Sequence, residues 1–130
     1  MFKYETMREA LNERIPEILR SARYTEILEF WGDEEIPIYC YYESLEFLFI
    51  GLVNSEIKDG ELLKRVIEFM EDMANSEDDD VATLLQVQIL EGLFGLDRSV
   101  FIEMEKKLLP RTAELLECTK HWFRAPNGYS

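Results

Sequence analysis

The pair of Cys118 and His121 is the first place where the residue types of this chain could support catalysis. His121 is the chain's one histidine, and Cys118 stands three residues before it. A cysteine or serine nucleophile needs a histidine base placed against it, but here both residues belong to one predicted helix. No Gly-x-Ser-x-Gly turn or comparable nucleophile turn occurs in the sequence. We therefore interpret His121 as an ordinary surface or cap residue near a helix C-terminus.

Three consecutive aspartates, Asp78, Asp79 and Asp80, could bind calcium. An EF-hand loop needs a glycine at its sixth position and a glutamate at its twelfth. Counted from Asp78, these positions hold Thr83 and Ile89, so the pattern is not met. The aspartates fit the first turn of a helix better, because the positive end of the helix dipole stabilises them there.

Other cofactor and metal motifs are equally incomplete. Glu68 and Asp72 have helical spacing and could share a metal, but di-iron bundles need Glu-x-x-His, and a cysteine stands where the acid would be. The six glycines are scattered and form no Walker or dinucleotide pattern. The sequence therefore predicts no catalytic residue, no metal site and no cofactor. An enzyme whose carboxylates bind a divalent metal is the alternative left open.

Charge is strongly segregated along the chain. All 14 Lys and Arg residues lie outside two windows, 24–57 and 66–97, which hold eight and nine acidic residues, and the net charge is −13. A one-signed field of this kind repels nucleic acid and anionic membrane and speeds encounter with a basic partner. No basic nucleic-acid footprint is present. We therefore expect a basic protein partner, with no nucleic-acid or membrane binding.

Aromatic residues follow the acidic run of the first window. Tyrosine beside exposed acids is typical of a binding hot spot for a basic protein, although packing of the same tyrosines into the core is the alternative. We expect the acids to form a rim and one tyrosine to form the apolar anchor. The candidate partner-binding residues are Asp33, Glu34, Glu35, Tyr39, Tyr41, Tyr42, Glu43, Asp78, Asp79 and Asp80.

The elements that position these residues are predicted to be helices, because apolar residues recur with helical periodicity along most of the chain. In residues 60–74, apolar side chains recur at spacings of three and four, with Asp59 placed as N-cap. Ser76 stands three residues before Asp79 in a capping-box-like arrangement, which predicts a central helix over 81–94 that is apolar almost all round. Further helices are predicted over 3–14, 17–30 and 39–54, from Asp97 or Ser99, and from Pro110, with a loop at 33–38. Phe30-Trp31-Gly32 is expected to end the helix over 17–30, and a strand is the alternative for 39–54.

The predicted fold is all-α, with six or seven helices packed as antiparallel helical hairpins and HEAT-like at most. Short loops favour pairing of adjacent helices, and no second copy of the 60–94 pair is convincing. We expect one domain over residues 1–124 and a loose tail over 125–130. Cys40 and Cys118 are expected to be free buried thiols.

Localisation is expected to be cytoplasmic. The start of the chain has no basic stretch followed by an apolar run, as a secretory signal would. The longest apolar stretch of interest, Phe47 to Val53, is far shorter than the ~20 residues a membrane span needs.

The chain resembles a known group of proteins in two segments, Trp31-Gly32-Asp33-Glu34-Glu35-Ile36-Pro37 and the run from Leu62 to Ser76. These are small, acidic, all-helical bacterial immunity-type proteins associated with polymorphic and contact-dependent growth inhibition toxins. The likeness covers most of residues 5–123 and consists of fold-level patterns. It implies a helical fold and inhibition of a toxin domain by tight binding, and it supplies no catalytic residues.

The function expected from charge and resemblance together is that of a cytoplasmic immunity protein. It would bind and neutralise a basic toxin domain, such as a nuclease, through an acidic surface. The alternative is a HEAT-like adaptor or scaffold module that binds a partner without inhibiting it.

Overall fold

The computed structural model describes residues 2–127, with side chains described as far as His121. Within residues 2–127 there are seven α-helices and no strand, so the all-α prediction is confirmed. The α-helices are α1 (Met7–Arg14), α2 (Ala22–Trp31), α3 (Ile38–Val53), α4 (Gly60–Ala74), α5 (Asp79–Leu84), α6 (Arg98–Lys107) and α7 (Pro110–Asn127). Four shorter segments join them: 3-10 turns η1 (Tyr4–Thr6), η2 (Pro16–Arg20) and η4 (Glu91–Gly95), and the π-helical η3 (Leu85–Leu90).

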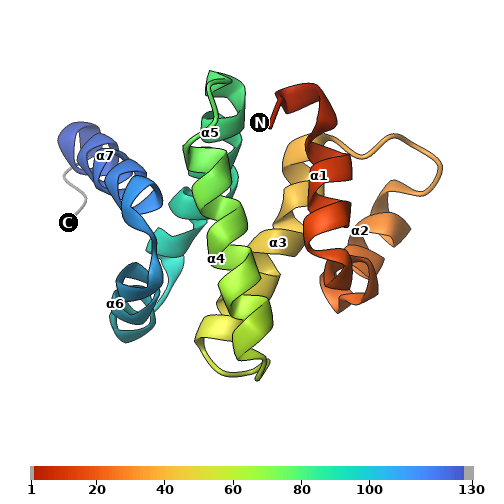
Figure 1. Ribbon diagram of the computed structural model, residues 1–130, viewed down its shortest axis with the longest axis horizontal. Coiled ribbons are helices and arrows are strands. Elements are labelled where there is room, and N and C mark those ends of the chain that lie inside the picture. Colours follow the sequence, from red (N-terminus) through yellow and green to blue (C-terminus); the bar gives the residue numbers. More distant parts are fainter. Residues whose placement is uncertain (1, 128–130) are drawn as a thin grey trace.

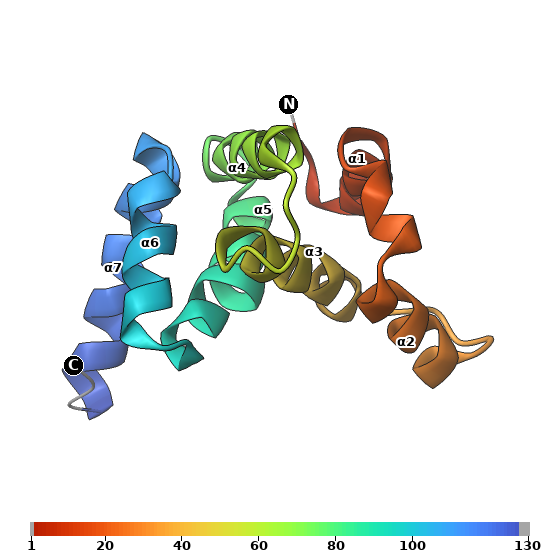
Figure 2. The same ribbon diagram turned by 90° about the horizontal axis from the view of Figure 1, so that it is seen from below.

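The helices alternate in direction, as expected for antiparallel hairpins. Figure 1 shows α3, α4 and α5 in the middle, with α1 and α2 on one side and α6 and α7 on the other. The connection from α3 to α4 lies at one end of the molecule and that from α4 to α5 at the opposite end. At the edge, α6 and α7 lie side by side (Figure 2), and Lys120 of α7 is ion-paired with Glu105 of α6.

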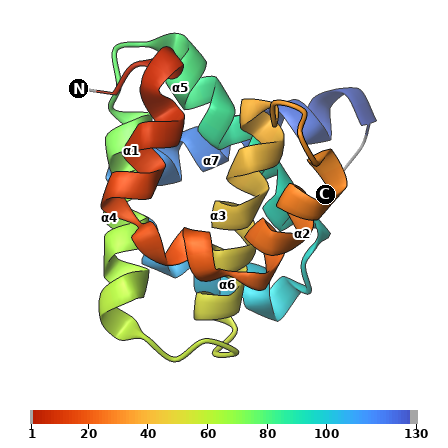
Figure 3. The same ribbon diagram turned by 90° about the vertical axis from the view of Figure 1, so that its right-hand side faces the viewer.

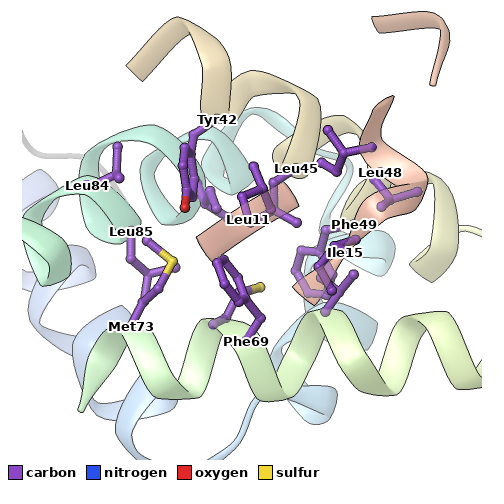
Figure 4. Close-up of a cluster of buried hydrophobic side chains, with 14 of the residues drawn as sticks. Leu11, Ile15, Tyr42, Leu45, Leu48, Phe49, Phe69, Met73, Leu84 and Leu85 are labelled. Atoms are coloured by element: carbon purple, nitrogen blue, oxygen red, sulfur yellow. The ribbon is translucent and has the colours of Figure 1, made fainter. Parts of the chain in front are cut away.

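The stripe predicted on residues 60–74 is the buried face of α4. Asp59 caps this helix as predicted, because its Oδ1 accepts a 3.0 Å hydrogen bond from the Leu62 amide. Figure 4 shows Phe69 and Met73 of α4 pointing toward side chains of α1, α3 and α5. The buried residues around them include Leu11, Ile15, Tyr42, Leu45, Phe49, Leu84 and Leu85.

The helix predicted over 17–30 is divided in the structure. Pro16 begins only the short turn η2, and the backbone at Ser21 is extended. Ser21 instead caps α2, because its Oγ accepts a 3.2 Å hydrogen bond from the Tyr24 amide. The helix ends as predicted at Gly32, whose φ of +57° belongs to the left-handed region that side-chain-bearing residues rarely adopt.

The start of α5 also differs from the prediction. Asp78, not Ser76, is the N-cap, and its Oδ1 accepts a 3.0 Å hydrogen bond from the Asp80 amide. The Ser76 hydroxyl is engaged elsewhere: it donates to the Phe2 carbonyl at 2.8 Å and accepts from the Asp78 amide at 3.1 Å. The helical segment that contains the predicted 81–94 helix therefore begins at Asp79, with Asp78 as its N-cap, and not directly after Ser76.

The continuation of α5 is not uniform α-helix. The segment predicted as one helix over 81–94 passes from α5 into π-helical η3 and then into η4. Two glutamines of η3 reach neighbouring helices, Gln86 donating to Thr119 of α7 at 3.0 Å and Gln88 donating to Glu46 of α3 at 3.1 Å. A Cβ at Gly92 of η4 would meet the Glu46 carboxylate, so a larger residue there would require the Glu46 side chain to move.

Glu71 of α4 attaches α7 to the rest of the fold. Its two carboxylate oxygens accept hydrogen bonds of 2.9 Å from the amides of Arg111 and Thr112, and Oε1 also accepts from the Thr112 hydroxyl at 2.9 Å. Because α7 begins at Pro110 as predicted, these amides are among the unpaired donors of its first turn. An acidic side chain from α4 therefore caps the N-terminus of α7.

The C-terminal boundary and the cysteines depart from expectation. Helix α7 continues to Asn127, beyond the expected end at residue 124, and positions 128–130 of the expected tail lie outside the described residues. Both cysteines are free as predicted, but Cys40 is only half-buried and Cys118 is exposed. Across the described part of the chain, no helix has the length and apolar content of a membrane span.

Candidate partner-binding surface

Three segments that are distant in sequence meet at one end of the molecule. Figures 1 and 3 both show η1, the start of α5 and the start of α3 at the end opposite the α3–α4 connection. The Tyr4 amide donates a 2.9 Å hydrogen bond to Asp78 Oδ2, which joins η1 to the start of α5. We call this surface the acidic end. Its acidic residues are Glu5 of η1, Asp78, Asp79 and Asp80 at the start of α5, and Asp33, Glu34 and Glu35 of the loop that leads into α3.

A cleft of about 480 Å³ opens at the acidic end between η1, α1 and the segment before α3. Arg8 is the basic residue of this cleft, and its guanidinium is held inward: it donates to the Ile36 carbonyl and lies over the Tyr41 ring at 5.0 Å. The cleft therefore has acids at its edge and a cation already engaged by the protein. It is lined by Tyr4, Glu5, Arg8, Glu35, Ile36, Pro37 and Ile38.

Tyr39 is the candidate tyrosine that belongs to this surface. It is half-buried. Burial raises the pKa of its hydroxyl above the ordinary value, and neighbouring Tyr4 and Asp80 raise it further. Those two neighbours place Tyr39 between the N-terminal turn and the start of α5. The phenol stays neutral at physiological pH and can act as a hydrogen-bond donor.

Of the three candidate tyrosines, Tyr41 and Tyr42 are buried, so neither can be the exposed anchor. Tyr41 is 5% exposed and Tyr42 is 0% exposed. The Tyr42 hydroxyl donates to the Met7 carbonyl at 2.7 Å, and the Tyr41 hydroxyl donates to Asn12 Oδ1 at 2.6 Å. Both rings pack under α1, and burial raises the pKa of both hydroxyls. They hold α1 against α3 and are unavailable to a partner.

The predicted acids divide into structural and free groups. Asp78 is structural, because its two oxygens accept from the amides of Asp80 and Tyr4. Glu43 is half-buried, ion-paired with Arg23, and faces α2 instead of the acidic end. The other five are exposed and form no ion pair within the described residues: Asp33, Glu34, Glu35, Asp79 and Asp80.

An exposed aromatic group at the C-terminal end of α2 was not predicted from the sequence. Phe30 is 82% exposed and packs edge-on against Trp31, at 5.6 Å between ring centroids. The available signal was that Leu28 and Phe30 widen the apolar set of this helix beyond one buried stripe. Phe30 borders a second cleft of about 410 Å³, which we call the aromatic cleft. Its lining residues are Arg23, Glu26, Ile27, Phe30, Trp31, Cys40 and Glu43.

The possible metal ligands do not gather. Among the residues whose positions are described, no three His, Cys, Asp or Glu side chains form a group that could hold a metal ion. Glu68 is exposed, and Asp72 is ion-paired with Arg14 at 2.8 Å. His121 is exposed on α7. What the arrangement provides is a carboxylate-rich surface next to two clefts.

Fold and surface together define a small all-α domain with an acidic end. The chain belongs to the family described as Domain of unknown function (DUF7674), whose model matches residues 8–122. This match includes α1 except Met7, all of α2 to α6, and most of α7. No curated protein and no solved structure matches the chain.

Proposed function

We propose that this chain is a protein-binding module that holds a basic protein partner at its acidic end. The observation that carries the proposal is a set of five exposed acids that form no ion pair within the described residues. Asp33, Glu34 and Glu35 lie in the loop that leads into α3, where Glu35 lines the cleft, and Asp79 and Asp80 lie at the start of α5, where Asp80 is a neighbour of Tyr39. An ordinary solvated surface mixes charges of both signs. Like charges gathered at one end repel each other, and a basic partner would relieve that repulsion.

Complementary charge would act first on the rate of encounter. Exposed carboxylates create a field that steers a basic protein toward this end and raises its association rate. The aromatic side chains Tyr4 and Tyr39 beside the cleft would then supply contact area with few rotatable bonds. The charges give orientation, and the rings reduce the rate of dissociation.

The resemblance to immunity-type proteins extends the proposal to a specific biological outcome. A nuclease domain must hold a polyanion, so its active site is electropositive and an acidic helical surface can cover it. In this form the chain neutralises a basic toxin domain in the cytoplasm. No catalytic step by this chain is required, because occupation of the toxin's active site is sufficient.

Co-purification with paired charge variants tests the proposal. The tagged full chain is expressed in its native host, and bound protein is identified after washing at low and high salt. We expect a basic protein that is released by salt and lost when Asp33, Glu34 and Glu35 are all changed to Lys. A matched control changes Glu13, Glu56 and Glu68 to Lys, which are exposed acids away from the acidic end.

The same experiment separates inhibition from simple attachment. If the partner is a toxin, adding the chain should abolish its activity in vitro at a one-to-one ratio. Retention of full partner activity in the complex would favour the adaptor alternative. Capture of an acidic partner, or equal loss in both triple variants, would contradict binding at the acidic end.

A further inference from the structure

The aromatic cleft has features of a binding site separate from the cleft at the acidic end. Phe30 is the most exposed of the large apolar side chains in the described residues, at 82%. Its ring and that of Trp31 form one wall, and Ile27 is buried beneath. Asp33 and Glu34 follow Trp31 after a single glycine, so the aromatic wall and the acidic end are continuous along the chain.

Acidic residues dominate the charge of the aromatic cleft. Glu26 and Glu43 line it together with one basic residue, Arg23. Arg23 is bound closely by Glu43 and stacks over the Phe47 ring at 4.6 Å. Its contact with Glu26 is loose, at 4.0 Å, and Glu26 is largely exposed. One carboxylate at the rim therefore remains available to a second cation.

Arg23 also shows which chemistry suits these surroundings. A planar guanidinium stacks on an aromatic face and accepts a carboxylate at its edge, whereas an ammonium group is a more strongly hydrated point charge. In the Arg23 arrangement, Phe47 supplies the aromatic face and Glu43 supplies the carboxylate. On the same helix as Arg23, Glu26 and Phe30 offer the same two groups and are both exposed.

We infer that the aromatic cleft binds an arginine side chain of the basic partner. The guanidinium stacks on the Phe30 ring and pairs with Glu26 at the rim, and the aliphatic stem lies along Trp31. This inference rests on the proposed function, since it names the side chain through which the basic partner is held. Charge complementarity selects arginine over an apolar side chain, and ring stacking selects it over lysine.

Titration with small probes tests the inference without any partner protein. The probe is Nα-acetyl-arginine amide, compared with the amides of Nα-acetyl-lysine and Nα-acetyl-norleucine. Binding is followed by amide NMR through the Gly32 backbone signal and the Trp31 indole signal, which is assigned with a Trp31→Phe variant. We expect saturable shifts at both positions with the arginine probe, and weaker binding of the lysine and norleucine probes.

Two exposed positions supply the variants. Phe30→Ala should weaken arginine binding by about two- to fivefold, the size expected for an exposed cation–π contact. Glu26→Gln should reduce binding of the arginine probe to the level of norleucine and leave norleucine binding unchanged. Leu19→Ala, at another exposed apolar residue, is the control and should change nothing.

Several results would overturn the inference. Equal binding of norleucine would make the cleft merely apolar, and equal binding of lysine would remove the stacking argument. Shifts that depend on protein concentration without probe would assign the cleft to a second copy of this chain. Because no partner is present in the titration, loss of the probe response refutes this inference and leaves the claim of binding at the acidic end intact. A triple reversal at Asp33, Glu34 and Glu35 that leaves partner binding unchanged refutes the proposed function, even if the arginine probe still binds.

Discussion

Asp78 and Tyr4 are joined by a hydrogen bond of 2.9 Å, from the Tyr4 amide to Asp78 Oδ2, across 74 residues of sequence. The other oxygen of the same carboxylate accepts from the Asp80 amide at 3.0 Å and caps α5. One side chain therefore begins a helix and attaches the N-terminal turn to it. This double role organises the acidic end.

Asp78→Ala should lower the free energy of unfolding by about 2 kcal/mol. Loss of a helix cap costs typically ~1 kcal/mol, and loss of the second hydrogen bond costs about as much again. Urea unfolding measures the change. Asp79→Ala is the matched control, because Asp79 is an exposed neighbour and its removal should cost less than about 1 kcal/mol. Equal costs for the two variants would show that the Asp78 bonds are not significant for stability.

Glu71→Ala should also destabilise the fold by about 2 kcal/mol. The variant removes the acceptor for two amides of α7 and for the hydroxyl of Thr112, which is 1% exposed and would be left buried without this partner. Glu68→Ala, on an exposed position of the same helix, should stay within ~0.5 kcal/mol of the parent chain. A Glu71 variant as stable as the Glu68 variant would contradict the capping role.

Tyr42→Phe should cost about 1 kcal/mol of stability, because the Met7 carbonyl loses a buried donor. It should leave partner binding unchanged, since the ring lies beneath α1. Chemical denaturation and binding measurements on the same preparation check both statements. A Tyr42→Phe variant with unchanged stability and faster partner dissociation would reverse our assignment of this residue.

We expect the carboxyl group of Glu46 to make the free energy of unfolding depend on pH. Burial raises the pKa of its carboxyl, and Glu43 adds to this, while the Gln88 hydrogen bond and Arg23 act in the opposite direction. The folded state therefore favours protonated Glu46. Its contribution to stability is complete below the ordinary glutamate pKa of about 4.3 and is lost as the pH rises through the higher folded pKa.

The Glu46→Gln variant should not show this loss of stability with rising pH, because its side chain does not ionise. Unfolding free energies measured from pH 4 to pH 7.5 should show the parent chain losing stability relative to Glu46→Gln as the pH increases. Subtraction of the two profiles cancels the general repulsion among the other acids. A difference that does not vary with pH would mean that Glu46 ionises normally in the folded state.

The parts of the fold that follow from local pattern were predictable. Helix α4 has a strict apolar stripe and a capping aspartate, Asp59, within its own sequence, and both are confirmed. Pro110 and Gly32 act through their own backbone restrictions, so the helix start and end that they mark were also predicted.

Features decided by distant segments could not be predicted in this way. Ser76 and Asp78 are both suitable N-caps by residue type. Each is hydrogen-bonded to the N-terminal segment, Ser76 to the Phe2 carbonyl and Asp78 to the Tyr4 amide, and the local sequence does not reveal these contacts. Likewise α3 is apolar on most of its faces, so periodicity does not distinguish a tyrosine beneath α1 from one at the surface. Of the candidate site, the exposed acids were predicted correctly as surface residues, whereas Tyr41 and Tyr42 were not.

The association rate of the chain with its captured partner, measured against salt concentration, tests the central claim most directly. The variant with Lys at positions 33, 34 and 35 should associate at least about tenfold more slowly at low salt, with a flatter salt dependence, because steering charges act on encounter. The control with Lys at positions 13, 56 and 68 has the same net charge and should retain most of the parent rate. Equal slowing in both variants, or none in either, would contradict binding of a basic partner at the acidic end.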